Sequence, residues 1–250
     1  MSVDAPTQLA PGIHRLGNEY VNCYLLEEGN DLTLVDGGLP GFRPQLDAYL
    51  QSRGRSVKDI AAVILTHAHA DHVGIVEHVR EDSQAPVYVH AKDAEMARTT
   101  GKTHKRDGSL LPYLRYPALY KLFLVAGRAG GARTPNVEVV TTFDAEQDLD
   151  VPGRPRIIPT PGHSPGHVAF HLPEQGTLIA GDALCTYNPL TGAKGPQLMP
   201  RAFAADSLQM QKSLEAIERV DATLTLFGHG EPWTESPQAA VDRARERGLT

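Results

Sequence analysis

AAVILTHAHADH, residues 61–72, is the stretch that decides the fold and indicates the chemistry. Its first five residues form a continuous apolar run, typical of a strand buried on both faces. Four side chains that can bind a metal follow within six residues: His67, His69, Asp71 and His72. Imidazoles and carboxylates are the usual ligands of borderline divalent metals. A single histidine is more often structural, but four such groups on a loop leaving a strand indicate a site for two ions.

Three more candidate ligands follow, each next to a glycine at the end of an expected strand. They are His163 in TPGHSPGH (160–167), Asp182 in IAGDAL (179–184) and His229 in LFGHG (226–230). Glycine permits tight turns and close approach of the backbone, which suits a crowded rim of ligands. Each motif alone is weak, because a Gly-Asp pair is far more often a turn than a ligand. Together with the first cluster they complete a set for two ions.

Apolar patterns predict strands that alternate with helices along the whole chain. Runs at 21–28 and 31–38, joined at Gly29-Asn30, predict a β-hairpin. The other expected strands are 61–67, 86–91, 137–143, 156–162, 167–172, 176–184 and 222–230, and the expected helices are 41–53, 72–81, 206–220 and 237–247. Two halves of mixed strands and helices predict sheets inside and helices outside.

The composition favours one soluble domain, spanning 1–250, with a small-molecule substrate. Apolar residues make up 41% of the 250, and the net charge of −6 gives no reason to expect nucleic acid. We find no signal peptide and no stretch approaching the roughly 18 apolar residues of a membrane span. With only Cys23 and Cys185, a disulfide framework is not expected, and the cytoplasm is the expected location.

One segment, 101–136, differs from the rest of the chain. It holds seven Lys/Arg residues against a single acid, Asp107, together with many Leu, Tyr and Phe residues. We expect a helical insertion. Two interpretations stay open: a lid over the metals, with an apolar wall and a preference for anionic or acyl substrates, or a pair of solvated surface helices.

The order HAHADH, TPGHSPGH, GD and GHG resembles the metallo-β-lactamase superfamily, over residues 12 to 232. The resemblance implies an α/β (α+β) fold, a four-layer αββα sandwich with the metals at one edge of the two sheets. It implies one metal on His67, His69 and His163, a second on Asp71, His72 and His229, and a bridging Asp182. Asp36, in LVDGG, matches an acidic strand-end position of the family and is expected to orient the site.

Several other residues near these motifs are not counted as ligands. His167 is interpreted as a packed histidine close to the site. Cys185 follows Asp182 closely, but the set of ligands is full without it. The remaining histidines have no motif support and are treated as ordinary: His14, His78, His90, His104 and His171.

Such a metal pair implies a hydrolytic mechanism. Two cations about 3.5–4 Å apart share a water and lower its pKa from about 15.7 towards 7, so that hydroxide can attack a carbonyl. Asp71 is the expected catalytic residue, because it can hold or receive the proton of the nucleophile. No serine or cysteine nucleophile is then needed. Zinc is the expected metal, with iron or manganese as alternatives.

The leading functional hypothesis is hydrolysis of a small ester, thioester or lactone. The resemblance suggests that true β-lactamases usually lack the bridging aspartate, whereas thioesterases similar to glyoxalase II and lactonases have it. Lactonases that open acyl-homoserine lactones typically carry a tyrosine three residues after that aspartate. Cys185 stands there in this chain, and the nearest tyrosine is Tyr187. The basic residues Arg243, Arg245 and Arg247 are candidates for glutathione binding, although surface charge explains them equally.

Other function classes remain as alternatives. A persulfide dioxygenase shares this fold but uses a single iron, so metal analysis separates it from a hydrolase. A nuclease is favoured only by the basic insertion. A β-lactamase is less expected, and a non-catalytic binding module fits poorly because no ligand position is missing. The sequence leaves open whether the chain forms a homodimer.

Overall fold

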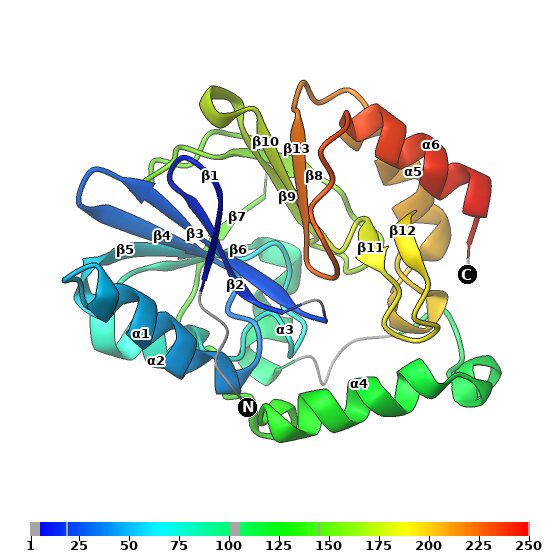
Figure 1. Cartoon of the computed structure of the whole chain (residues 1–250), viewed down its shortest axis with the longest axis horizontal. Helices are drawn as coiled ribbons and strands as arrows, with labels where there is room; N and C mark the ends of the chain where they lie inside the picture. The colour runs from blue at the N-terminus through cyan, green and yellow to red at the C-terminus, as the bar shows by residue number, and fades with distance from the viewer. Residues whose placement is uncertain (1–5, 19, 101–105, 145, 250) are drawn as a thin grey trace.

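The computed structural model describes residues 6–18, 20–100, 106–144 and 146–249. Two mixed sheets pack face to face, and helices cover their outer faces (Figure 1). This arrangement confirms the expected αββα sandwich. No helix among these residues is long and apolar enough to cross a membrane.

The larger sheet has seven strands in chain order. They are β1 (Thr7–Ala10), β2 (Ile13–Gly17), β3 (Asn22–Glu28), β4 (Asp31–Val35), β5 (Ile60–Ile64), β6 (Val87–His90) and β7 (Thr141–Phe143). Strands β1 to β4 run antiparallel, and β4 to β7 run parallel. Glu28 pairs with Asp31 across a two-residue turn, so the hairpin expected at Gly29-Asn30 is present. Gly29 has φ +61°, a value that glycine tolerates without strain.

The second sheet has the order β13-β10-β9-β8. Its strands are β8 (Arg156–Pro159), β9 (Val168–Leu172), β10 (Thr177–Gly181) and β13 (Leu224–Phe227). Strands β10 and β13 are parallel, while β9 runs antiparallel to both β8 and β10. A separate two-stranded ribbon, β11 (Cys185–Tyr187) and β12 (Lys194–Gln197), lies beside it.

Along each central strand, successive side chains point alternately into the core under the helices and into the core between the two sheets. On β3, Cys23 and Leu25 point into a core shared with helices, whereas Tyr24 and Leu26 point into the core between the two sheets. All four are buried, which explains why the strand reads as a continuous apolar run. The outer layers are α1 (Arg43–Ser52), α2 (Val76–Ser83) and α3 (Ala94–Thr99) on one side, and α5 (Ser207–Ile217) and α6 (Pro237–Arg247) on the other.

The structure shortens several expected elements where the candidate ligands begin. The helix expected from residue 72 starts only at Val76. Before it, the N–H of Gly37 donates to the carbonyl of His72 over 2.6 Å, and that of Gly74 donates to Gly38 over 2.8 Å. A Cβ on Gly74 would lie 2.3 Å from the Gly38 oxygen, so the two loops require glycine there. The backbone therefore bonds to a neighbouring loop instead of continuing a helix.

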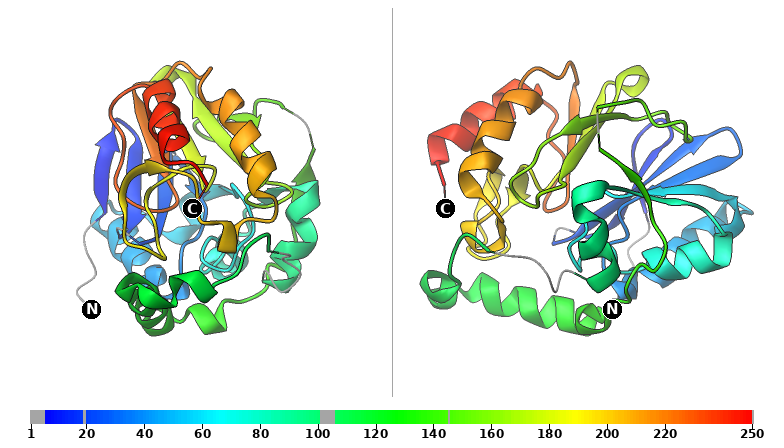
Figure 2. Two further views of the ribbon diagram at one scale, coloured as in Figure 1. Left: turned by 90° about the vertical axis from the view of Figure 1, so that its right-hand side faces the viewer. Right: turned by 180° about the vertical axis from the view of Figure 1, so that it is seen from behind.

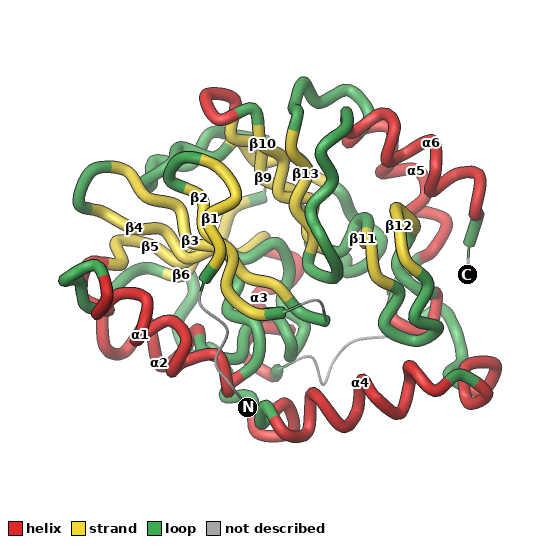
Figure 3. The backbone as a smooth tube through the Cα atoms, in the orientation of Figure 1, coloured by secondary structure: helices red, strands yellow, loops and turns green. Residues whose placement is uncertain are grey.

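Other strands are also shorter than expected and cover only the apolar centres of the predicted ranges. The strand expected at 137–143 is only β7, and those expected at 176–184 and 222–230 end at Gly181 and Phe227. Sequence patterns did not predict β1, β2, β11, β12 or α3, because these elements are short and weakly patterned. Figure 3 shows how loops occupy the region between these strand ends and the helix α4.

The helical insertion contains a 3₁₀ helix (Leu111–Arg115) and α4 (Pro117–Arg128), while residues 101–105 lie outside the described part. The helix α4 runs along the same side of the molecule in every view (Figure 2). Tyr113 and Leu119 pack against Leu190 and Ala202 in a small core of their own. The insertion is therefore attached to the loop between β11 and β12 and to the segment that follows β12.

Candidate metal centre

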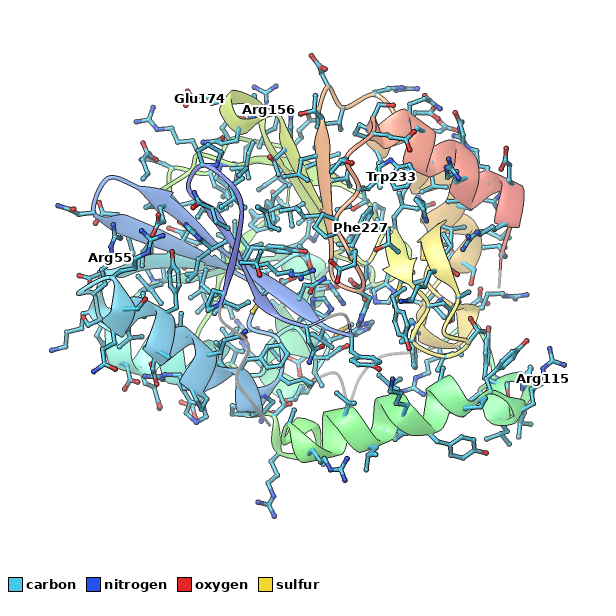
Figure 4. The ribbon with its side chains drawn as sticks, in the orientation of Figure 1. Arg55, Arg115, Arg156, Glu174, Phe227 and Trp233 are labelled. Atoms are coloured by element: carbon cyan, nitrogen blue, oxygen red, sulfur yellow. The ribbon has the colours of Figure 1, made fainter. Side chains whose placement is uncertain are left out.

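The sheet topology gathers all the candidate ligand motifs at one edge of the sandwich. Strands β4 and β5 are parallel, so Asp36 and His67 leave the first sheet at the same edge. Strands β8, β10 and β13 share one direction, so His163, Asp182 and His229 follow their carboxyl ends. In Figure 4, Phe227 marks the end of β13, immediately before the loop that carries His229. The positions expected from sequence therefore converge in space.

Ring nitrogens of His67, His69 and His163 lie close together, and we call these three residues the imidazole trio. The Nδ1 atom of His69 lies 3.1 Å from Nε2 of His67 and 2.9 Å from Nε2 of His163. Tetrahedral zinc with bonds of about 2.0–2.1 Å would place its nitrogen ligands roughly 3.3 Å apart. Both separations from His69 are therefore close to the edge length of such a tetrahedron.

Asp71, His72 and His229 form a second set of converging groups, which we call the mixed group. Their ligand atoms all lie within 4.8 Å of one another. Nε2 of His229 is 3.6 Å from Oδ2 of Asp71, the least buried member. This set has the oxygen and nitrogen donors that a divalent ion accepts.

The carboxylate of Asp182 lies between the trio and the mixed group. Its Oδ2 is 3.2 Å from Nε2 of His163 and 3.1 Å from Nε2 of His229, and its Oδ1 is 3.5 Å from Nε2 of His72. Burial alone would raise the pKa of Asp182, but the surrounding histidines lower it well below its usual range. One ionised carboxylate therefore faces both sets of ligands at once.

Two buried atoms of this cluster support the fit to a metal. Nε2 of His72 and Oδ1 of Asp182 have no hydrogen-bond partner within the part of the chain that the structure describes. A buried polar atom without a partner costs about 1–3 kcal/mol, which a bound cation would offset. Burial and the neighbouring imidazoles also lower the pKa of His67 well below its usual value. The ring is therefore neutral, as metal binding requires.

Groups behind the cluster hold the rings in place. Oδ2 of Asp36 is 2.9 Å from Nδ1 of His72, and the same carboxylate accepts hydrogen bonds from both the backbone N–H and the hydroxyl of Thr66, each over 2.8 Å. Asp36 therefore stands where its expected orienting role requires. Nδ1 of His229 contacts the carbonyl oxygen of Tyr20. Such outer contacts fix which ring nitrogen faces a metal.

His167 is packed beside the site, as its interpretation from sequence had it, but it also has a defined task. Its Nε2 accepts a hydrogen bond of 2.9 Å from the backbone N–H of Asp182. Its Nδ1 therefore carries the proton and donates to the hydroxyl of Thr160 over 2.8 Å. Burial lowers the pKa of His167 to about 3, so the ring stays neutral. His167 thus holds the backbone of the bridging residue.

Sequence reasoning missed Asn22, which anchors the loop carrying His229. The side-chain amide of Asn22 donates to the carbonyls of Phe227 (3.0 Å) and Gly230 (2.7 Å), and its backbone N–H donates to Gly228 (2.8 Å). A lone asparagine at the start of a strand carries no sequence signal for this role. Only the packing of β3 against the end of β13 reveals it.

Other residues noted in the sequence do not belong to the two ligand sets. Cys185 is buried in the core beneath α5 and α6, with Sγ 3.9 Å from the carbonyl of Leu198. His14 pairs with Glu27, and His171 contacts the carbonyl of Asp221. His104 falls outside the described residues. The contacts of His14 and His171 lie outside the two ligand sets, as their interpretation as ordinary residues expects.

A cavity of about 260 Å³ opens onto the ligand cluster. Part of its wall is apolar, from Leu122 of α4 together with Pro189, Met199 and Phe203, and Arg106 and Thr100 add polar groups. The remaining lining residues are His69, Ala70, Asp71, His163, Asp182 and His229. The insertion therefore forms part of the cavity wall.

Comparison with known proteins agrees with this geometry. The family model described as "Metallo-beta-lactamase superfamily" matches residues 16–229. The chain is 28% identical over 239 residues to "Probable metallo-hydrolase YflN" of Bacillus subtilis (strain 168), covering 91% of this chain and 87% of that protein.

Two solved structures have the same fold. A metallo-β-lactamase family protein of Thermus thermophilus, TTHA1429, shares 26% identity and a TM-score of 0.68, covering 96% of this chain and 80% of the other. TTHA1623, solved in a di-iron-bound form, shares 30% identity and a TM-score of 0.57, covering 88% and 92%. The family match spans most of the sequence, and the fold and the order of the motifs agree with it, so the chain belongs to the metallo-β-lactamase superfamily.

Proposed function

We propose that the chain is a binuclear metal-dependent hydrolase that cleaves a small ester, thioester or lactone. The observation that carries this proposal is the Asp182 carboxylate, which faces the imidazole trio with one oxygen and His72 of the mixed group with the other. We assign one ion to the trio, one to the mixed group, and the bridging role to Asp182. Two divalent ions bound there would supply a water of lowered pKa and a Lewis acid for the carbonyl.

The residues of the chain have separate tasks in this proposal. Asp71 is half-buried and lines the cavity, so its carboxylate can reach the water or the substrate and accept a proton. The trio is otherwise enclosed by its own loops and faces the cavity through His69 and His163. Asp71 is accordingly our candidate for the catalytic base. The metal is proposed to be zinc, although the di-iron relative makes iron a real alternative.

The cavity supports an acyl substrate. Leu122, Met199 and Phe203 offer an apolar surface to an acyl chain close to the ligand cluster. Arg106 is exposed and lies on the same cavity, where its guanidinium can pair with an anionic group of the substrate. We therefore extend the lid hypothesis: the insertion supplies one part of the apolar wall through Leu122 of α4 and a charge through Arg106.

A panel of substrates assayed together with metal analysis tests the proposal. Purified protein should contain about two divalent ions, hydrolyse at least one class among thioesters, lactones and aryl esters, and lose activity on chelation. A single iron with oxygen consumption on a persulfide substrate would instead favour the dioxygenase alternative. Protein that binds no metal, or activity that chelators do not change, would contradict the assignment.

Arg106→Ala tests the anionic half of the substrate hypothesis. Because Arg106 is exposed, its ion pair is worth about 1 kcal/mol at most, so KM for a carboxylate-bearing ester should rise about fivefold. The KM for the matching neutral ester and the metal content should not change. Arg115→Ala is the control, since Arg115 lies on the 3₁₀ helix of the insertion, stacks on Tyr116 and points away from the rest of the molecule (Figure 4). Equal effects on both esters would count against charge recognition.

A further inference from the structure

Asp93 is a buried carboxylate that accepts hydrogen bonds from the loop carrying His163, a member of the imidazole trio. It stands directly before α3 and is 0% exposed. An acid at this position usually caps its own helix, but the Asp93 side chain makes no capping hydrogen bond to α3. It turns instead towards the two ligand loops.

The donors that Asp93 binds lie next to the candidate ligands in the sequence. The hydroxyl of Ser164 donates to Oδ2 over 2.5 Å, and the N–H of Gly166 donates to Oδ1 over 2.7 Å. The backbone N–H of Ala68 also interacts with the same carboxylate and lowers its pKa. Ala68 lies between His67 and His69, and Ser164 follows His163 directly. One side chain therefore joins the loop 67–72 to the loop 160–167.

The sequence of the second loop is adapted to this contact. A Cβ on Gly166 would lie 2.8 Å from both Cγ and Oδ1 of Asp93, too close for any other residue. Gly166 is thus explained by the approach of Asp93, not by a turn of unusual φ. Burial raises the pKa of Asp93, and the hydrogen-bonding groups of Ser164, Gly166 and Ala68 oppose that rise. Burying a carboxylate costs free energy unless hydrogen bonds compensate for its lost hydration. In this chain the compensating groups belong to the ligand loops.

We propose that Asp93 is a positioning residue that clamps the two loops together and sets the spacing of the imidazole trio. The inference rests on the proposed metal site and adds a residue that positions its ligands without binding the metal. The mixed group has other supports, because Asp36 holds His72 and the carbonyl of Tyr20 contacts His229. The effect of Asp93 should therefore be confined to one of the two metal positions.

Stepwise titration of the metal-free protein with Zn²⁺, in competition with a chromogenic chelator, tests the clamp. His69→Ala identifies which step belongs to the trio. Asp93→Ala should weaken that step about 10–100-fold, the usual cost of removing an outer partner, and leave the other step within about threefold. Asp93→Asn, which retains one carboxamide oxygen, should recover part of the loss. Ser164→Ala removes a single donor and should give a smaller loss in the same step.

Glu77→Gln is the matched control. Glu77 is also a buried acid that joins two segments, because it accepts hydrogen bonds from Arg80 and from the N–H of Glu138. This variant should lower the melting temperature without changing either zinc affinity. Wild-type affinities in Asp93→Ala and Ser164→Ala, or equal weakening of both steps, would overturn the clamp while leaving the hydrolase proposal standing. Failure of the wild-type protein to bind zinc or iron would remove both.

Discussion

Asp182→Ala is expected to lower kcat/KM by more than a hundredfold and to reduce the metal content below two ions. The carboxylate faces both ligand sets, at 3.2 Å from His163 and 3.1 Å from His229. Loss of an outer partner alone costs about 10–100-fold, and a bridging ligand should cost more. Without it, the two cations would also repel each other across a site of low polarity. Metal analysis and kinetics on the best substrate of the panel measure both effects.

Two further variants make the Asp182 result interpretable. Asp182→Asn keeps the shape of the side chain but removes its charge, so it should also lose metal and activity. Asp221→Ala is the control, because the contact recorded for Asp221 uses its backbone carbonyl, which the substitution leaves in place. Two bound ions and full activity in Asp182→Ala would refute the bridging role.

The ligand cluster could be predicted because its signal is local. His67, His69 and Asp71 follow one another within a few residues, directly after a run that only a buried strand explains. The later candidates, such as His163, each follow a strand and a glycine, and parallel strands bring their ends to one edge. The spacing of the first cluster is a property that the sequence carries. The convergence of all seven groups was expected because the order of the motifs resembles the metallo-β-lactamase superfamily, and the directions of the strands come from the structure.

The supporting residues could not be predicted in the same way. Asn22 and Asp93 act on loops far away in the sequence: Asn22 bonds to Phe227, and Asp93 bonds to Ser164. Nothing near either residue indicates its partner. Their roles come from how strands and helices dock, which is decided by the whole core.

The packing of the insertion could not be predicted from the sequence either. Its composition predicted a helix, and α4 is there, but composition did not say which side would face the protein. Leu119 is buried, whereas Tyr120 and Phe123 on the same helix remain 59% and 57% exposed. Helical spacing alone does not predict which of two apolar faces of a helix is buried, because that depends on the surface against which the helix packs.

Gly228→Ala should remove metal binding almost as completely as the loss of Asp182, although it changes no ligand. A Cβ there would lie 2.0 Å from Oδ1 of Asp182 and 2.7 Å from Cε1 of His72. Neither neighbour can retreat easily, because His167 holds the backbone N–H of Asp182 and Asp36 holds the His72 ring. We expect zinc affinity to fall more than a hundredfold and stability to fall by about 1–3 kcal/mol, the usual cost of overpacking.

Gly127→Ala provides the comparison, since a Cβ on this glycine of α4 would meet nothing within 4 Å. It should bind zinc normally, and its free energy of unfolding should rise by about 0.5–1 kcal/mol, because alanine is more stable than glycine in a helix.

A double variant separates the two ways in which Gly228→Ala could weaken zinc binding. If the new methyl group acts by displacing Asp182, adding Gly228→Ala to Asp182→Ala should cost little more zinc affinity, because residues that act through one contact are not additive. Fully additive losses would mean that Gly228 matters for the strand end itself, and wild-type zinc affinity in Gly228→Ala would contradict the close approach on which the bridging assignment depends.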